Sequence, residues 1–244
     1  MNRQTSSRVA VITGATSGIG AAIAHSLSKA GYSLVLNAPS SDKLNALSSE
    51  LGGACVAVAG NLRAETLPET LLAAALNNYG RCDVCFNNGG LLEAGTVETV
   101  DIERICNMVR VNVEGAFRTA YTFLQHFVQQ GQGHLVNTSS VLGKKARPTV
   151  GAYAATKYAI EALSEALRME LGKSDVRISC IEPGLVRTGL PDRWEVPPAE
   201  LVGIQDPQEP EEIARMVLYL LEPPKDARQP RRPIFVREHE LAFT

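Results

Sequence analysis

The residues best suited to do chemistry are a tyrosine and a lysine four positions apart, Tyr153 and Lys157. Tyr153 directly precedes the stretch Ala154–Leu171, which contains Lys157 and in which apolar residues recur at helical spacing, so both side chains fall on one face of the predicted helix. A free tyrosine has a pKa of about 10 and exchanges protons poorly near neutral pH. An ammonium one turn away favours the phenolate and should lower that pKa. The pair therefore predicts a proton-transfer group; two exposed helical residues without a role are the alternative.

A glycine-rich turn near the N-terminus has the composition of a phosphate site. The apolar run Val9–Thr13 reads as a buried strand and leads into Gly14-Ala15-Thr16-Ser17-Gly18-Ile19-Gly20, which a helix follows. Gly14 permits a tight turn, Gly18 lets backbone amides approach an anion, and Gly20 lets the helix pack close to the sheet. The pattern predicts a pyrophosphate held at a helix N-terminus. Three glycines also suit any tight strand-to-helix turn, and the spacing GxxxGxG departs from GxGxxG.

Between the glycine turn and the Tyr153/Lys157 pair stand Asn87-Asn88-Gly89-Gly90, Asn112 and Ser140, and Pro183-Gly184-Leu185-Val186-Arg187-Thr188 comes after the pair. In this combination and order, the motifs resemble the short-chain dehydrogenase/reductase family, over residues from about 8 to 221. Ser140 matches the family serine better than Ser139 does, because Val141-Leu142-Gly143 follows it. One YxxxK motif is common, whereas the whole ordered series is specific.

The resemblance implies a catalytic set of Asn112, Ser140, Tyr153 and Lys157. Tyr153 would give or take the substrate proton, and Ser140 would hydrogen-bond the substrate oxygen as charge develops on it. Lys157 would also bind the nicotinamide ribose, and Asn112 would hold a water molecule that relays protons. The expected reaction is hydride transfer between a nicotinamide cofactor and a ketone or aldehyde and its alcohol.

The resemblance also implies a cofactor site. The expected binding residues are Gly14, Thr16, Ser17, Gly18, Ile19, Gly20, Ala38, Pro39, Ser40, Asn61, Leu62, Asn88, Gly89, Tyr153, Lys157, Pro183, Gly184, Val186 and Thr188. Asn61 stands where the family tends to have an aspartate, and Gly89 where it usually has an alanine.

The choice between the two nicotinamide cofactors depends on the end of the second predicted strand. The segment Asn37-Ala38-Pro39-Ser40-Ser41 has no carboxylate for a ribose 2′-hydroxyl, which favours NADP(H) over NAD(H). It also lacks the arginine that commonly binds a 2′-phosphate. Ser40, Ser41 and Lys43 would contact that phosphate or, equally, cap the next helix.

Strand-like and helical segments alternate along the chain, which predicts an α/β fold: a single doubly wound, Rossmann-type domain over residues 1–244. A mostly parallel, seven-stranded sheet with helices on both faces is expected. Its strands are predicted at Val9–Thr13, Ser33–Asn37, Ala54–Gly60, Asp83–Asn87, His134–Ser139, Arg177–Ile181 and Pro233–Val236. The proline-rich segment 189–210, which contains Trp194, follows a strand end and is expected to be a substrate lid; a surface excursion is the alternative. The role of the C-terminal tail 228–244 stays open.

Composition excludes several classes of protein. A net charge of −2 without an early basic block argues against a nucleic-acid partner. No apolar run is long enough to span a bilayer, and the first eight residues lack a signal-peptide core, so a cytoplasmic location away from membranes is expected. The four histidines show no metal-ligand spacing, so no metal is expected. The five cysteines, including the Cys82/Cys85 CxxC pair, read as small apolar residues of a reducing compartment.

Two other functions stay open. A 3-oxoacyl thioester reductase would use the same catalytic set, although the C-terminus lacks the glycine pair common in that branch. A catalytically silent nucleotide sensor would keep the fold without needing a proton relay. A homodimer or homotetramer, formed through helices near 101–130 and 154–172, follows from the resemblance alone.

The substrate pocket is expected between the segment 89–96, the residues after Ser140 and the segment 189–210. Leu91, Leu92, Leu142 and Trp194 would make it apolar, whereas Lys144, Lys145 and Arg147 would suit an acidic substrate.

Overall fold

The computed structural model describes residues 7–188 and 207–221. Six parallel strands form one sheet in the order β3-β2-β1-β4-β5-β6, so the chain winds outward from β1 in one direction and then crosses to β4 to wind in the other. This is the predicted doubly wound arrangement. The strands are β1 Val9–Thr13, β2 Ser33–Ala38, β3 Cys55–Ala59, β4 Val84–Asn87, β5 Gly133–Thr138 and β6 Val176–Ile181.

Six of the seven predicted strands are therefore present, with ends shifted by one residue or less. The seventh, Pro233–Val236, lies outside the described residues, and so does most of the expected lid. β1, β2 and β4 are buried throughout, as expected for strands covered on both faces, whereas β3 at the edge is only partly buried.

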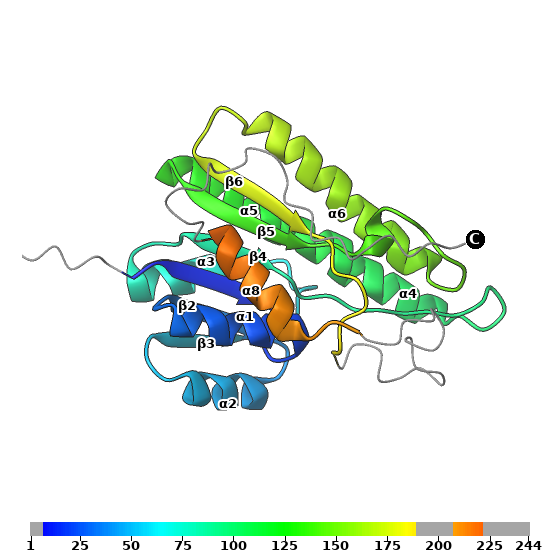
Figure 1. Ribbon diagram of the computed structural model, residues 1–244, viewed down its shortest axis with the longest axis horizontal. Coiled ribbons are helices and arrows are strands. Elements are labelled where there is room, and N and C mark those ends of the chain that lie inside the picture. The colour runs from blue at the N-terminus through cyan, green and yellow to red at the C-terminus, as the bar shows by residue number, and fades with distance from the viewer. Residues whose placement is uncertain (1–6, 189–206, 222–244) are drawn as a thin grey trace, which may run out of the picture.

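Helices cover both faces of the sheet and create two separate apolar cores (Figure 1). One core lies under α1, α2 and α8, and the other under α3, α5 and α6. The helices are α1 Gly18–Lys29, α2 Ser41–Leu51, α3 Leu67–Tyr79, α4 Ile102–Val109, α5 Ala116–Gln130, α6 Gly151–Glu170 and α8 Pro210–Leu221. A short 3₁₀ turn, η2 Val141–Gly143, follows β5.

The long helix expected near residues 101–130 is interrupted. A π-helical segment, η1 Arg110–Gly115, joins α4 to α5 and carries Asn112. Such widened turns are rare and often occur at functional sites. Apolar periodicity does not reveal this segment, because the residues on either side of it keep ordinary helical spacing.

The carboxyl ends of all six strands point to the same side of the molecule (Figure 1). In a doubly wound sheet this edge holds the ligand, at the point where the winding reverses between β1 and β4. Every described candidate site residue comes from a strand end on this edge or from the part of the chain between that strand and the next.

Two expectations from composition can be compared with the described part of the chain. None of its helices combines the length and the apolarity needed to cross a bilayer. Cys82 and Cys85 are fully buried, and burial raises the pKa of both thiols, which confirms the interpretation of this CxxC pair as core residues. Cys55 and Cys106 are only partly buried.

Candidate active site

The glycine turn between β1 and α1 depends on conformations that other residues rarely adopt. Gly14 and Gly18 have positive φ angles of 65° and 49°. A side chain at Gly20 would overlap the carbonyl oxygen of Gly14, so α1 packs against the turn only because this position has no Cβ. Ser17 is the N-cap residue of α1, and no cap hydrogen bond uses its side chain. The turn thus presents the unpaired N–H groups and positive dipole end of a 12-residue helix, which suits a bound anion.

The turn is held against the end of β4 by a residue that sequence reasoning missed. The hydroxyl oxygen of Thr13 accepts hydrogen bonds from the backbone N–H groups of Asn88 and Gly89, both at 3.0 Å. The Asn88 side chain in return donates to the Thr13 carbonyl at 3.1 Å. A Cβ at Gly89 would meet the end of the Leu62 side chain at 2.5 Å, so the missing methyl group makes room for Leu62. The only signal for Thr13 in the sequence was its place as the last residue of the strand.

Asn112 faces inward from η1 and is 2 % exposed. Its Oδ1 accepts from the Leu91 N–H at 2.7 Å, and its Nδ2 donates to the Leu91 carbonyl at 2.8 Å and to Thr156 Oγ1 at 3.2 Å. Asn112 thereby ties the segment after β4 to α6, the helix that carries Tyr153 and Lys157. The sequence did not indicate that Thr156 would accept a hydrogen bond from Asn112.

Ser140 and Tyr153 lie together, as the sequence predicted. The Ser140 hydroxyl lies near enough to the Tyr153 phenol to affect its pKa, and both side chains are buried. The Ser140 hydroxyl also accepts from the Leu142 N–H at 3.2 Å and so begins the η2 turn. Ser139 has a different place, since its hydroxyl donates to the Lys157 carbonyl at 3.3 Å. The geometry thus places Ser140, and not Ser139, against the tyrosine.

Lys157 lies beside Tyr153, with its Nζ 5.6 Å from the centre of the tyrosine ring. The ammonium donates to the Thr138 carbonyl at 2.9 Å, at the end of β5. Burial raises the pKa of Tyr153 to about 12, while the hydrogen bond with Ser140 lowers it in part. The expected lowering of the tyrosine pKa is therefore wrong for this structure. Removing the hydroxyl from water disfavours the phenolate more than its neighbours favour it.

The segment after β6 returns to the glycine turn. The Pro183 carbonyl accepts from the Val141 N–H at 3.1 Å and from the Ser140 hydroxyl at 3.5 Å. A Cβ at Gly18 would overlap the Thr188 side chain, so Thr188 lies directly on the glycine turn. Val186 pairs with Gln208 just before α8, so the described chain after β6 lies next to the described chain that leads into α8. The structure thus gathers the glycine turn, the Ser140 turn and the Pro183–Thr188 segment at one place.

At the end of β2, the polar side chains expected near the cofactor make hydrogen bonds within the protein. Asn37 is buried and donates to the Val58 and Gly60 carbonyls at 3.0 and 3.1 Å, so its side chain is engaged inside the fold. Ala38 is buried, whereas Pro39 is exposed. Ser40 is the N-cap of α2, and its hydroxyl accepts from the Lys43 N–H at 3.4 Å. Ser40 therefore has the capping role that the sequence left open, and Ser41 is the first helical residue.

Asn61, expected near the adenine, stands on the surface after β3, and its Oδ1 accepts from the Arg63 N–H at 3.0 Å.

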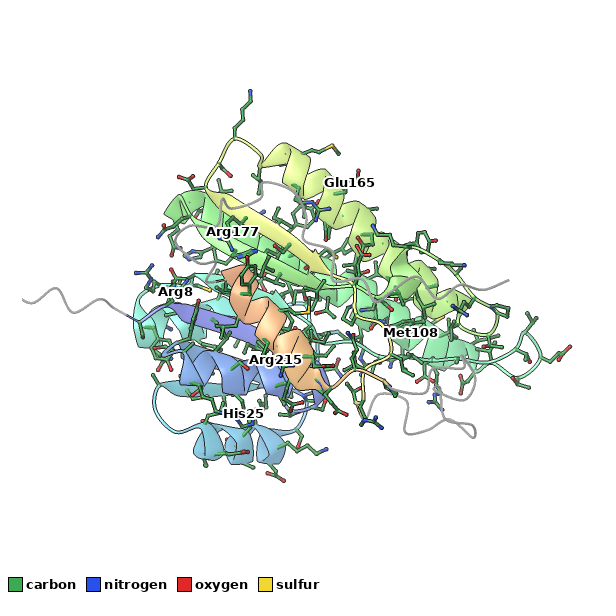
Figure 2. All side chains as sticks on the ribbon, in the orientation of Figure 1. Arg8, His25, Met108, Glu165, Arg177 and Arg215 are labelled. Atoms are coloured by element: carbon green, nitrogen blue, oxygen red, sulfur yellow. The ribbon has the colours of Figure 1, made fainter. Side chains whose placement is uncertain are left out.

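The residues expected to line the substrate pocket are only partly available. Leu91, Leu92 and Leu142 are half-buried around the site, whereas Trp194 lies outside the described residues. Met108 of α4 (labelled in Figure 2) is buried beneath the segment that carries Leu91 and Leu92, and its sulfur accepts a hydrogen bond from the Glu93 N–H. Lys144 forms an ion pair with Glu161 at 3.0 Å. This ion pair competes with the predicted contact between Lys144 and an acidic substrate.

Comparison with known proteins agrees with this geometry. The family model for the short chain dehydrogenase matches residues 8–196, well over half of the chain. The chain belongs to this family. Its order of motifs, from the glycine turn to Thr188, is therefore the order of a short chain dehydrogenase.

Relatives within the short chain dehydrogenases are oxidoreductases. An uncharacterized oxidoreductase of Staphylococcus epidermidis is 31% identical over 217 residues, which cover 89% of this chain and 92% of that protein. Among solved structures, an alcohol dehydrogenase of the archaeon Thermococcus sibiricus, complexed with 5-hydroxy-NADP, is 33% identical. It superposes with a TM-score of 0.82 over 94% of this chain and 96% of that one.

A 3-ketoacyl-(acyl-carrier-protein) reductase of Brucella melitensis, complexed with NADH, is 27% identical with a TM-score of 0.82 over 88% of this chain and 91% of that one. These two structures hold nicotinamide cofactors of both kinds. The chain is accordingly an oxidoreductase of the short chain dehydrogenase family with structural neighbours that bind NAD or NADP.

Proposed function

We propose that this protein is a carbonyl reductase or alcohol dehydrogenase that uses a nicotinamide cofactor and in which Tyr153 transfers the substrate proton. The observation that carries the proposal is the contact between the Ser140 and Tyr153 hydroxyls, with the Lys157 ammonium beside the tyrosine ring. A proton donor and a second hydroxyl that converge on one point suit a substrate oxygen on which charge develops.

The residues of the strand edge fit a dinucleotide. The glycine turn leaves room that a Cβ would fill, and the N–H groups of α1 suit a pyrophosphate. Lys157 and Tyr153 would lie toward the nicotinamide end, and Asn61 toward the adenine end. When bound, the cofactor supplies or accepts the hydride.

The roles of the chain's own residues follow from their contacts. Ser140 holds the substrate oxygen next to Tyr153, and the phenol gives its proton to that oxygen during reduction. Burial keeps Tyr153 protonated at neutral pH, the form that reduction requires. Lys157 supplies the positive charge that stabilises the tyrosinate formed in the step. Asn112 fixes the segment after β4 against α6.

Tyr153→Phe tests the proposal. We expect this variant to retain cofactor binding while its turnover falls by about 10²–10⁴-fold, the usual contribution of a positioned acid or base. The assay follows cofactor absorbance with a panel of ketones, aldehydes and 3-oxoacyl thioesters. Tyr158→Phe is the matched control, because Tyr158 lies on the same helix with 44% of its surface exposed. Wild-type turnover in Tyr153→Phe contradicts the mechanism. Cofactor binding without turnover of any substrate by the wild type favours the sensor.

For the cofactor, we propose a preference for NADP(H), supported by the absence of a carboxylate between Asn37 and Ser41. Titration of the purified protein with NADPH and with NADH, followed by cofactor fluorescence, checks this. Tighter binding of NADH contradicts it.

We also propose a homo-oligomer that uses the outer surfaces of α4, α5 and α6. Large apolar side chains are exposed there: Ile102, Tyr121, Val128, Tyr158 and Met169. Sedimentation equilibrium that gives the mass of one chain at all concentrations would exclude this assembly.

A further inference from the structure

The hydroxyl of Thr156 joins two of the segments that build the candidate active site. Thr156 lies on α6, directly before Lys157, and is 2% exposed. Its Oγ1 donates to the Tyr153 carbonyl at 2.7 Å and accepts from Asn112 Nδ2 at 3.2 Å. This hydroxyl therefore links the backbone of the proposed proton donor to the buried side chain of Asn112 in η1.

The chemistry of the two groups determines the direction of the hydrogen bond between them. A threonine hydroxyl has one proton, and that of Thr156 goes to the Tyr153 carbonyl, which can only accept. The bond with Asn112 must therefore run from the carboxamide N–H to the hydroxyl oxygen. A carboxamide turned over would place Oδ1 against an oxygen with no proton left to give. Thr156 thus favours one orientation of the Asn112 side chain, with Nδ2 toward α6.

In this orientation the Asn112 side chain holds the backbone of the segment after β4. Oδ1 accepts from the Leu91 N–H at 2.7 Å, and Nδ2 donates to the Leu91 carbonyl at 2.8 Å. A Cβ at Gly90 would come within 3.2 Å of Oδ1, so the segment passes close to the carboxamide. Both N–H groups of the carboxamide are thereby used inside the protein, one by Leu91 and one by Thr156.

Side-chain hydrogen bonds matter at this place because the segment after β4 is irregular. Residues 88–96 contain neither helix nor strand, so no ladder of backbone hydrogen bonds holds them. Leu91, an expected wall of the substrate pocket, is half-buried there. Its position relative to Tyr153 depends on the chain of hydrogen bonds that runs through Asn112 and Thr156.

We propose that Thr156 is a positioning residue: its hydroxyl orients the Asn112 carboxamide and so holds the segment after β4 in place beside Tyr153. The proposal rests on the proposed function, in which Tyr153 transfers the substrate proton. Thr156 acts through Asn112 and not on the substrate.

The first test follows the Asn112 carboxamide by NMR and needs neither cofactor nor substrate. Thr156→Val keeps the shape of the side chain and removes the hydroxyl. In protein labelled with ¹⁵N, the Nδ2 protons of Asn112 are identified by their nuclear Overhauser effects to the Leu91 amide proton. We expect the proton that faces Thr156 in the wild type to shift upfield in Thr156→Val, because it has lost its acceptor. Unchanged carboxamide signals in the folded variant overturn the proposal.

Activity supplies a second readout. In Thr156→Val, kcat for carbonyl reduction should fall by about 10–10²-fold while cofactor binding is retained, because small displacements around a reacting group cost up to this much. A carboxamide signal that shifts while kcat keeps its wild-type value overturns the proposal. A wild type that turns over no substrate contradicts the proposed function instead, and the NMR measurement then decides separately whether Thr156 orients Asn112.

Thr156→Ser tests whether the hydroxyl itself is responsible. This variant keeps the hydroxyl and loses one methyl group, so it should restore both kcat and the carboxamide signals. A kcat that stays low in Thr156→Ser would assign the loss to packing of the methyl group, which overturns the proposal.

Ser164→Ala is the matched control. Ser164 also lies on α6 and is fully buried, and its hydroxyl donates to the Ile160 carbonyl at 2.7 Å and accepts from Asn137 Nδ2 at 2.9 Å. Asn137, however, belongs to β5, whose backbone is paired with β4 and β6. We therefore expect Ser164→Ala to lose stability as Thr156→Val does, yet to keep kcat and the Asn112 signals. An equal loss of kcat in both variants would make Thr156 a structural brace only, which overturns the proposal.

Thr156→Ala keeps the test decisive if Thr156→Val does not fold. The smaller side chain leaves room for a water molecule to accept the Asn112 N–H, which removes the cost of burying that group unpaired. The carboxamide proton should then exchange with water faster than in the wild type, and kcat should fall as expected for Thr156→Val. Wild-type exchange or wild-type kcat in Thr156→Ala overturns the proposal.

Discussion

The proposed cofactor side and the proposed proton-transfer side of this site meet at one edge of the sheet, but the first is built from backbone and the second from side chains. The glycine turn is made of backbone: it depends on positive φ angles at Gly14 and Gly18 and on the missing Cβ of Gly20. The cluster of Ser140, Tyr153 and Lys157 is made of buried side chains that contact one another.

This difference determines how each side responds to change. A backbone cradle offers N–H groups whatever its side chains are, so an added atom damages it more than a lost one. A buried polar cluster works through individual hydroxyl and ammonium groups, so a lost atom removes function while the packing persists. The two sides should therefore fail in opposite ways.

Gly20→Ala is the strongest test of the backbone side. The added methyl group would overlap the Gly14 carbonyl, so we expect NADPH affinity to fall more than about tenfold and stability to fall by about 1–3 kcal/mol, as in overpacked interiors. Fluorescence titration and urea denaturation measure the two effects. Gly151→Ala is the control, because a Cβ at the start of α6 meets nothing within 4 Å. Normal cofactor binding by Gly20→Ala would contradict the cradle.

Two neighbouring serines test the side-chain cluster. Ser140→Ala removes the hydroxyl that contacts Tyr153, so we expect turnover to fall by about 10²–10³-fold. Loss of the same hydrogen bond raises the pKa of Tyr153 further, which should move the onset of alcohol oxidation to higher pH. Ser139→Ala should retain activity at a cost of about 1 kcal/mol of stability, since within the described part of the chain its hydroxyl bonds the Lys157 carbonyl and not Tyr153. Steady-state kinetics measure the turnover of both variants. Equal losses of turnover in Ser140→Ala and Ser139→Ala would contradict the placement of Ser140, and not Ser139, beside Tyr153.

A third test concerns stability and pH. The Lys157 pKa of about 8 lies below the usual 10.5, so the unfolded chain binds more protons between these values, and stability should rise with pH in this window. From pH 7 to 9.5 the gain expected from Lys157 is about 2 kcal/mol. The raised pKa of Tyr153 acts in the opposite sense, but only above about pH 10. The free energy of unfolding, measured by urea denaturation at pH 7 and at pH 9.5, should rise by about 2 kcal/mol more in the wild type than in Lys157→Met. An equal change with pH in the two proteins would contradict a buried, ionisable Lys157.

The sequence predicted much of the site because its signals are local. Helical spacing placed Tyr153 and Lys157 on one face, and Val141-Leu142-Gly143 singled out Ser140 from Ser139. The parts that it missed depend on contacts between distant segments. The Thr13 hydroxyl accepts hydrogen bonds from the N–H groups of Asn88 and Gly89, which follow the neighbouring strand. Asn112 itself was predicted, but the π-helical turn that carries it does not show in the periodicity.

The sequence was enough to predict the succession of strands and helices and the glycine turn, which follow from spacing and from the backbone freedom of a few residues. It also indicated the candidate proton-transfer residues, through their spacing and the family resemblance. How these groups are solvated and paired follows only from the packed fold. Burial raised the pKa of Tyr153 where its helical neighbour alone implied a lowering, and it drew Lys144 into an ion pair with Glu161. The reason is physical: the cost of removing a charge from water depends on everything packed around it, and spacing along the chain does not specify that environment.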